Sequence, residues 1–454
     1  MKSRDKSASV AHAAHADAMD GRVKWGLPVG GPYAARVLLQ RPFNLSLTSW
    51  LYTYNSRPDS FLWESQDGTA AWVARNQDAT RIPELLNENG IEFVPMIARR
   101  SFHPHSGPTD SRGVCWLATG TSSHVACTVG QIVNTLVNVQ RGLRTPMRWL
   151  MAQNEPWCTR TYMSPSEAVD VWRIYLQPVA RLSNLSLVSP NVQFAHLSWF
   201  ADFLRACYDR RNAADPCDVE TVHGVAVHEY SCDESFWRSI YGGGGNGFRN
   251  AMSAALGSHG GFNWAAYFSS SSRRFWVTEH NCNWEGGGGF PSAVEQCLRV
   301  SGGRPETHGR GSIASMIDID QVAAYAWWTT SGNYAVGGRQ HNVRIANGDG
   351  SLTPPGRALV AVAQRDARTP PNISAVQALC SSPSPLPAAV ASPPPAPWQP
   401  PVCTPTMQTA CALGDAQRGQ ACSCQYVWQD GCDEPSSVTV SCGVQSSAEY
   451  EESR

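Results

Sequence analysis

The sequence alternates strand-like and helix-like stretches along most of its length, and this alternation restricts the possible folds more than any other feature. Eight short runs rich in apolar, aromatic and β-branched residues lie at 24–29, 45–55, 92–98, 147–156, 185–192, 222–230, 275–280 and 322–330. Strands that alternate with helices pair in parallel, so eight units over roughly 340 residues predict an α/β fold, a (β/α)8 TIM barrel. An open doubly wound sheet is the alternative, but no GxGxxG follows a strand-like run.

The intervening segments carry helix signals. Residues 82–89 form a short amphipathic stretch with Pro83 in the first turn and Gly90 immediately after it. A second helix is expected at 126–141. Ser164-Pro165-Ser166-Glu167 is a helix start, and apolar residues then recur at helical spacing. These helices are expected to pack on the strands and to carry no chemistry.

Two of the strand-like runs deliver a glutamate at or near their end. Glu155 follows the apolar run 149–152 and precedes Pro156, which cannot continue a strand ladder. Glu279 ends a similar run, 274–280. In a parallel barrel both positions lie at the C-terminal rim, where catalytic groups gather. Either glutamate alone is more typical of a solvated loop, but two in matching contexts indicate cleavage of a glycosidic bond by a pair of carboxyl groups.

The amino-acid composition restricts where the protein can act and what it can bind. The net charge of −1 and the 16 % of charged residues predict no binding to nucleic acid or to a membrane surface, and no apolar run reaches the roughly 18 residues of a membrane span. Fifteen cysteines indicate disulfides and an oxidising compartment. Residues 1–20 contain basic residues but no apolar core of a signal peptide. The protein is nevertheless expected to be secreted or associated with a cell wall.

Changes in composition predict five segments. Residues 1–22 are expected to be disordered, residues 23–380 to form the catalytic barrel, and residues 381–401 to be a Pro-rich linker. Residues 402–443 contain six cysteines and are expected to form a small disulfide-stapled module. Residues 444–454 form an acidic tail.

Between about residues 24 and 359 the chain resembles glycoside hydrolase family 128, a family of endo-β-1,3-glucanases. The motifs are SWLYTY at 49–54, FVPMI at 93–97, Asn154-Glu155-Pro156, Ser189-Pro190, His228-Glu229-Tyr230, FWVTE at 275–279, YAWW at 325–328 and NGDGSLTPPG at 347–356. The resemblance implies a retaining enzyme in which Glu155 is the general acid/base and Glu279 the nucleophile. It also implies that Cys207 and Cys217 pair.

Further site residues follow from these motifs. Asn154 is expected to bind the sugar 2-OH, Tyr230 to donate a hydrogen bond to Glu279, and His228 to position the site, unless it is an ordinary core histidine. The candidate walls of the sugar subsites are aromatic: Trp50, Tyr52, Trp276, Trp327 and Trp328. Strand alternation predicts that about half of these face the helices instead. The expected substrate is a β-glucan polysaccharide, bound by a monomer that uses no metal and no cofactor.

The chain also departs from the family pattern at several positions: Thr53, Tyr54, Ala98, Arg99, Trp157, Glu229 and His280. These departures remove aromatic surface near the expected cleft but leave both glutamates in place. Two alternatives therefore stay open. One is a related barrel glycosidase that attacks another β-linked polysaccharide. The other is an inactive or weakly active glucan-binding protein.

Overall fold

The computed structural model describes a large part of the chain. The described residues are 25–29, 38, 48–54, 56–58, 81–97, 101–102, 115–117, 125–158, 162–242, 246–269, 273–282, 292–328, 334–336, 339–341, 343–347, 351–364, 372–382, 422–427 and 437–442. The chain divides into two compact units, residues 1–333 with 341–384, and residues 334–340 with 385–454.

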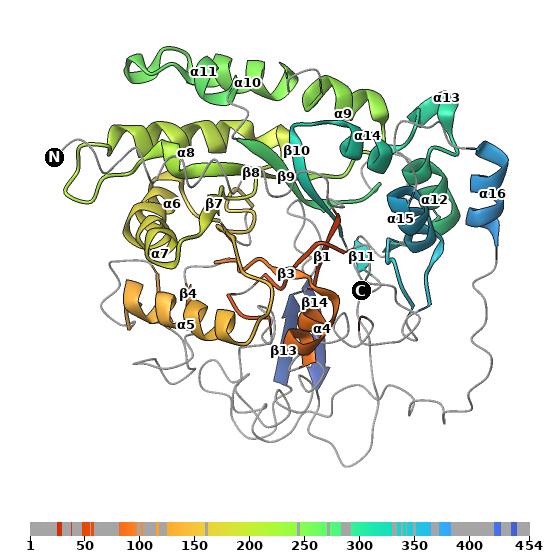
Figure 1. Cartoon of the computed structure of the whole chain (residues 1–454), viewed down its shortest axis with the longest axis horizontal. Coiled ribbons are helices and arrows are strands. Elements are labelled where there is room, and N and C mark those ends of the chain that lie inside the picture. The colour runs from red at the N-terminus through yellow and green to blue at the C-terminus, as the bar shows by residue number, and fades with distance from the viewer. Residues whose placement is uncertain are drawn as a thin grey trace. The chain divides into compact units, whose positions relative to one another are not determined.

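Strands lie at the centre of the first unit (Figure 1). Eight of them form one parallel sheet. They are β1 (Trp25–Pro28), β2 (Trp50–Tyr52), β3 (Glu92–Phe93), β6 (Trp149–Met151), β7 (Ser186–Val188), β8 (Val222–Glu229), β9 (Arg274–His280) and β10 (Val322–Trp327). Each lies within, or one residue from, one of the eight predicted runs. Their order in the sheet is β3-β2-β1-β10-β9-β8-β7-β6.

The two ends of this sheet meet. Beyond β3, Met96 forms a parallel bridge with Met151 of β6. Two backbone hydrogen bonds support it, from Met151 N–H to the carbonyl of Pro95 (2.9 Å) and from Ile97 N–H to the carbonyl of Met151 (3.0 Å). The sheet therefore curls into a (β/α)8-like barrel, as the alternation of elements predicted, and the C-terminal ends of its strands share one rim.

Helices surround the strands (Figure 1). They are α4 (Ile82–Asn89), α5 (Val129–Arg141), α6 (Pro165–Val171), the π-helix η2 (Trp172–Leu176), α7 (Gln177–Ser183), α8 (Leu197–Asp209), α9 (Glu234–Ile240), α10 (Asn246–Leu256), α11 (Trp264–Ser269), α12 (Ala293–Ser301), α13 (Pro305–His308), α14 (Ser312–Asp318), α15 (Pro354–Gln364) and α16 (Ile373–Ser381). Short 3-10 turns are η3 (Phe194–His196), η4 (Val219–Thr221) and η5 (His259–Gly261). In the described residues no helix is both long and apolar enough to cross a bilayer.

The predicted helix signals operate as capping motifs. Helix α4 has Pro83 in its first turn and ends at Gly90, whose φ of 65° is left-handed. Helix α6 begins with a capping box in which Ser164 and Glu167 bond each other's backbone N–H groups. The α6 pattern continues through η2 into α7, so the predicted helix is present and contains one turn of π-helix.

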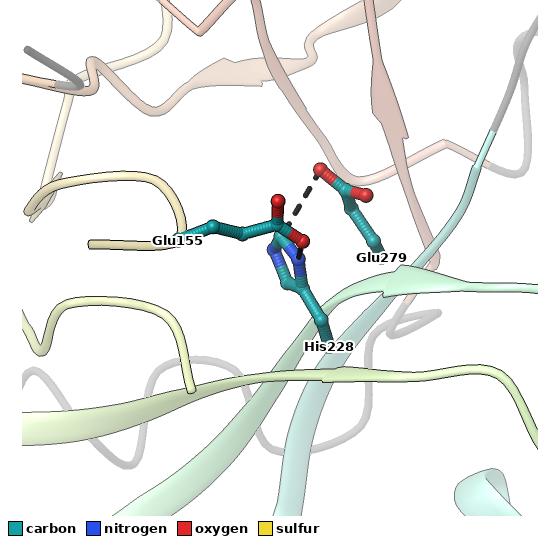
Figure 2. A group of neighbouring side chains, drawn as sticks. All are labelled: Glu155, His228 and Glu279. Atoms are coloured by element: carbon teal, nitrogen blue, oxygen red, sulfur yellow. Dashed lines mark hydrogen bonds and ion pairs between the residues drawn. The ribbon is translucent and has the colours of Figure 1, made fainter. Parts of the chain in front are cut away.

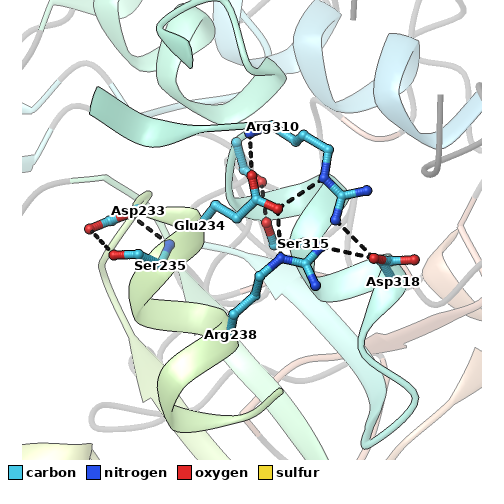
Figure 3. A network of polar contacts seen from close by, with 8 residues as sticks. Asp233, Glu234, Ser235, Arg238, Arg310, Ser315 and Asp318 are labelled. Atoms are coloured by element: carbon cyan, nitrogen blue, oxygen red, sulfur yellow. Dashed lines mark hydrogen bonds and ion pairs between the residues drawn. The ribbon is translucent and has the colours of Figure 1, made fainter. Parts of the chain in front are cut away.

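Charged side chains join α9 to α14 on the outside of the barrel (Figure 3). Glu234 accepts hydrogen bonds from Arg238 (2.7 Å) and Arg310 (2.9 Å), and Asp318 accepts from the same two arginines at 2.9 and 2.8 Å. Each charge therefore meets two of the opposite sign. This network holds the helix that follows β8 against the helix that precedes β10, which fixes the barrel wall on either side of β9.

Four disulfides join described cysteines to one another: Cys115–Cys127, Cys207–Cys217, Cys232–Cys282 and Cys297–Cys380. For these eight cysteines the preference for disulfides over a metal site is confirmed, and so is the expected Cys207–Cys217 pair. The disulfides suggest an extracellular protein, because disulfides persist in oxidising compartments.

Among the described residues, three strand pairs lie outside the barrel sheet. They are β4 (Ser101–Phe102) with β5 (Cys115–Trp116), β11 (Tyr334–Val336) with β12 (Arg339–His341), and the antiparallel β13 (Cys422–Val427) with β14 (Ser437–Cys442). The last pair lies within the predicted Cys-rich module, which otherwise falls outside the described residues and stays a prediction. The predicted segments 1–22 and 444–454, and the linker from residue 383 onward, also fall outside them.

Candidate active site

The two predicted glutamates lie at the C-terminal ends of their strands. Glu155 follows β6 and opens a turn in which Cys158 N–H donates to the Glu155 carbonyl (3.0 Å). Pro156 occupies the second position of this turn, where its fixed φ is favourable. Glu155 itself has a φ of 42°, a left-handed conformation that non-glycine residues rarely adopt. Such strain is concentrated at functional sites, where the surroundings enforce it.

Glu155, Glu279 and His228 meet at this rim (Figure 2). One carboxylate oxygen of each glutamate and one ring nitrogen of His228 all lie within 4.8 Å of one another. His228 Nδ1 is 2.6 Å from Glu155 Oε1, and His228 Nε2 is 3.6 Å from Glu279 Oε1. The imidazole therefore lies between two carboxyl groups that are far apart in the sequence.

Glu279 is held from both sides by phenols. Tyr54 donates to its Oε1 (2.7 Å) and Tyr230 donates to its Oε2 (2.8 Å). The Glu279 side chain is only 5 % exposed. Burial raises the pKa of Glu279 to about 7, with Glu155 adding to the rise, while His228 and the two phenols oppose it. The hydrogen bond predicted for Tyr230 is present.

His228 is fully buried, and a second polar side chain fixes its far nitrogen. Asn191 Nδ2 lies 2.9 Å from His228 Nε2 and donates to Thr278 Oγ1 (2.5 Å). In the neutral imidazole, Nε2 accepts from Asn191 and Nδ1 carries the proton that is donated toward Glu155. Burial lowers the pKa of His228, but the nearby carboxylates of Glu279 and Glu155 outweigh it, so the pKa is raised.

Three tyrosines near Glu279 remain protonated donors. Burial, reinforced by the charge of Glu279, raises the pKa values of Tyr52, Tyr54 and Tyr230 well above their usual range. A phenol that cannot ionise near neutral pH always offers its proton. Glu279 therefore has two permanent hydrogen-bond donors.

Two other predicted residues lie beside this cluster. Asn154 immediately precedes Glu155 and is 6 % exposed, and its Oδ1 is buried with no hydrogen-bond partner in the described part of the chain. A buried amide oxygen without a partner is unfavourable unless a ligand or water satisfies it. Trp328 follows β10, is partly buried, and has its ring centroid 6.2 Å from that of Tyr230 in an edge-to-face arrangement.

The structure corrects the prediction that Trp50, Tyr52 and Trp276 are subsite walls. All three have exposed fractions of 0 % and lie inside the barrel among alternate strand residues. Glycines opposite make room for them: a Cβ at Gly26 would overlap the ring of Trp50, and one at Gly224 would lie 2.9 Å from Trp276. As placed, these rings form the barrel floor beneath the carboxyl groups. Trp327 is buried too, with its Nε1 donating to the carbonyl of Val343 (2.6 Å).

Two site residues were missed from the sequence. Tyr54 was noted only as a departure from the family pattern, and Asn191 was not considered. The alternation of Trp50, Tyr52 and Tyr54 along one face of a strand is the signal that identifies Tyr54. Asn191 follows β7 by three residues, and its partners come from β8 and β9, so no local pattern indicates it.

The cluster has the donor set for a metal ion. Within the described residues, Glu155, His228 and Glu279 are the group whose ligand atoms lie close enough together to hold a metal ion. Both ring nitrogens of His228 are, however, already engaged, with Glu155 and Asn191. A metal would have to displace these contacts. Without one, the site offers a buried carboxyl group, a more exposed one and a protonatable imidazole, which suits hydrolysis by acid–base and nucleophilic chemistry.

Comparisons with known proteins give one family match and several similar solved structures. The model of the glycosyl hydrolase catalytic core family matches residues 121–359. A search of curated proteins found no match. Among solved structures, the chain resembles a glycoside hydrolase family 128 endo-β-1,3-glucanase from Sorangium cellulosum, at 20 % identity over 74 % of this chain and 98 % of that chain, with a TM-score of 0.42.

Two further solved structures resemble it. One is an exo-β-1,3-glucanase of the same family from Aureobasidium namibiae, at 14 % identity over 75 % of this chain and 97 % of that one, with a TM-score of 0.42. The other is an oligosaccharide-binding protein of that family from Trichoderma gamsii, at 15 % identity over 76 % and 94 %, with a TM-score of 0.38.

The segment matched by the family model covers more than half of the chain and contains Glu155, His228 and Glu279. It also contains strands β6 to β10, which form one side of the barrel rim. The expectation drawn from the motifs is thereby confirmed: the chain belongs to the glycosyl hydrolase catalytic core family.

Proposed function

We propose that the protein is a retaining endo-glycosidase that hydrolyses β-1,3-glucan through a covalent glycosyl-enzyme intermediate. The observation that carries the proposal is the approach of Glu155 and Glu279, which have one oxygen each within 4.8 Å. Retaining glycosidases hold their two carboxyl groups about 5–5.5 Å apart, and inverting ones about 6.5–9.5 Å. The β-1,3-glucan substrate is inferred from the ordered sequence motifs.

In this mechanism Glu279 is the nucleophile and Glu155 the acid/base. Protonated Glu155 gives its proton to the glycosidic oxygen while a Glu279 oxygen attacks the anomeric carbon, which forms the glycosyl-enzyme and releases the leaving group. Glu155 then removes a proton from water, which attacks the same carbon and frees Glu279. The side chain of Glu155 is 18 % exposed and can meet leaving group and water, whereas Glu279 is 5 % exposed and firmly held.

His228 and Asn154 support these roles. His228 Nδ1 lies 2.6 Å from Glu155 and His228 Nε2 lies 3.6 Å from Glu279. The pKa of His228 therefore depends on the charge of both carboxyl groups. Asn154 has the unpartnered buried oxygen needed to accept a hydrogen bond from the sugar 2-OH. That contact strengthens in the transition state. Trp328 is the remaining aromatic candidate for a sugar-binding wall.

The proposal extends to where and how the protein acts. The four disulfides among described cysteines suit a secreted or cell-wall-associated protein. All the groups used in the mechanism come from one chain, which suits a monomer. Two carboxyl groups and water suffice for the reaction, without metal or organic cofactor.

The test is hydrolysis of laminari-oligosaccharides by the full-length chain. Glu155→Gln and Glu279→Gln should each lower kcat/KM by more than about a hundredfold. Glu229→Gln is the matched control. It removes another buried carboxyl group but keeps an oxygen that can accept from Phe194 N–H and Tyr241 OH. It should leave most activity.

Three other outcomes would overturn the proposal. Binding of oligosaccharide without hydrolysis, unaffected by Glu155→Gln, would identify a glucan-binding protein. Cleavage of xylan or mixed-linkage glucan in preference to laminarin would identify a barrel glycosidase with another substrate. Full activity in Glu279→Gln would show that Glu279 is not the nucleophile.

A further inference from the structure

Tyr54 is placed in an unusual way for a residue just beyond a barrel strand. It follows β2 by two residues, is 3 % exposed, and has a φ of 56°. A left-handed backbone is uncommon for a bulky aromatic residue and persists only where the surroundings enforce it. The result is that the Tyr54 hydroxyl points at Glu279 and donates to its Oε1 at 2.7 Å.

Neighbouring groups hold the Tyr54 ring in that position. The ring of Tyr52 packs edge-to-face against it, with centroids 4.8 Å apart, and the two hydroxyl oxygens are 3.3 Å apart. Tyr52 OH donates to the carbonyl of Thr278 (2.6 Å), the residue before Glu279. Two hydrogen bonds therefore join the end of β2 to the end of β9, one to the backbone of Thr278 and one to the carboxyl group of Glu279.

We propose that Tyr54 is a positioning residue that holds the Glu279 carboxylate in line and favours its ionised form, so that it sets the acid limit of the reaction. The proposal rests on the function proposed above and assigns a role that the family pattern does not imply, since Tyr54 departs from that pattern. Tyr54 acts through Glu279 and needs no contact with substrate.

The two phenols on Glu279 are not interchangeable. Tyr54 occupies Oε1, the oxygen that faces His228 Nε2 at 3.6 Å, and Tyr230 occupies Oε2. With one donor on each oxygen, the carboxylate cannot rotate about its terminal bond without losing both. Loss of Tyr54 therefore frees one oxygen that Tyr230 does not reach.

The charged and titratable groups that face Glu279 come from three sides of the rim. Tyr52 ends β2 and Tyr54 lies just beyond it. Glu155 lies beyond β6. His228 lies at the end of β8 and Tyr230 directly after it. Burial and the charge of Glu155 favour the neutral acid, whereas His228, Tyr54 and Tyr230 favour the carboxylate. Removing a donor shifts this balance toward the protonated acid, which cannot act as the nucleophile.

The test compares the pH dependence of kcat/KM in the wild type and Tyr54→Phe. The acid limb should move to higher pH by about one unit in the variant, since a hydrogen bond to a charged group has that size of effect on a pKa. Activity should recover as the pH is raised further. A variant that was merely damaged would lose activity equally at every pH.

Tyr267→Phe is the matched control for the loss of a buried phenol. Tyr267 lies in α11, is 4 % exposed, and donates to the backbone carbonyl of Val219 (2.8 Å), with no carboxylate as acceptor. It should lose comparable stability without moving the acid limb. An equal shift in both variants would overturn the proposal.

A direct titration separates this proposal from the proposed function. Glutamate labelled with 13C at Cδ reports the ionisation of Glu279 in an intact protein, and Glu279→Gln assigns its signal. The Glu279 pKa should be about one unit higher in Tyr54→Phe than in the wild type. An unchanged pKa would overturn the role of Tyr54 even if the enzyme is active. A raised pKa in a protein that hydrolyses no glucan would uphold it while the proposed function fails.

Discussion

The chemical difference between the two glutamates is set by a few individual contacts. Glu279 is enclosed by Tyr54, Tyr230 and the barrel floor, whereas Glu155 is more exposed and has His228 as a neighbour at 2.6 Å. One carboxyl group is thus fixed in place, and the other is open enough to exchange protons with leaving group and water in the proposed mechanism. A pair of acids in contrasting environments is how a single site supplies two roles.

At the residue scale, Asn154→Ala should lower kcat/KM by about tenfold to a hundredfold, because one hydrogen bond to the sugar that strengthens in the transition state is lost. Its Oδ1 has no partner within the described residues, so the melting temperature should change little. Asn191→Ala serves as the comparison, since it breaks contacts with both His228 and Thr278 and should lower the melting temperature. Kinetics and thermal denaturation of both variants check the contrast.

His228→Gln should move the acid limb of kcat/KM to higher pH. When His228 is protonated, its charge lowers the pKa of Glu279, so replacing it leaves the buried acid protonated over a wider range. Glutamine keeps a polar group of similar reach but no charge. A pH profile of unchanged shape would show that the imidazole has only a packing role.

The sequence predicted residues whose placement at the rim depends on where a strand ends, and it missed Tyr54 and Asn191. Glu155, Glu279, His228 and Tyr230 follow from where strands end and from the family motifs. Tyr54 requires a left-handed φ of 56°, which no local propensity favours in a bulky residue. The predicted walls Trp50, Tyr52 and Trp276 failed because inward-facing strand positions below the rim are filled by side chains and are closed to sugar.

At the scale of elements, the site depends on how the strand ends are held together. The loop after β8 and the loop after β9 are joined by Cys232–Cys282, which lie close to Tyr230 and Glu279 in the chain. The network of Glu234, Arg238, Arg310 and Asp318 fixes the neighbouring helices. The eight strands were predictable from the apolar runs. Some of them are only two or three residues long, because turns and isolated bridges replace strand pairing near the rim.

Replacing both cysteines of this bridge, as Cys232→Ser with Cys282→Ser, should destabilise the protein by about 2–4 kcal/mol, because the bridge closes a chain separation of 50 residues. It should also lower kcat more than it raises KM, since the loops that carry Tyr230 and follow Glu279 gain freedom. Removing Cys207–Cys217, which closes a separation of only 10 residues between the end of α8 and the segment that follows it, should cost less stability and leave kcat nearly unchanged. Equal effects on kcat would contradict this account.

At the scale of the whole molecule, buried acids link stability to pH. Burial raises the pKa values of both Glu229 and Glu279 from 4.5 to about 7. The folded protein therefore binds these protons more tightly than the unfolded chain. The resulting stability is fully present below about pH 4.5 and is lost as the pH rises to about 7.

Glu229→Gln should remove one part of this dependence. The free energy of unfolding of the variant should exceed that of the wild type at pH 8 by about 3 kcal/mol at most, and the difference should vanish near pH 4. Glutamine can still accept the hydrogen bonds from Phe194 N–H and Tyr241 OH. Urea denaturation at several pH values measures it, and parallel curves for the two proteins would contradict the prediction.

The mouth of the barrel brings Glu155, beyond β6, close to Glu279 at the end of β9, and the proposed reaction depends on their closeness. The most direct measurement is the configuration of the sugar first released from a laminari-oligosaccharide, observed by NMR before the anomers equilibrate. Double displacement by Glu279 and Glu155 predicts initial release of the β-anomer. Initial release of the α-anomer would contradict the account.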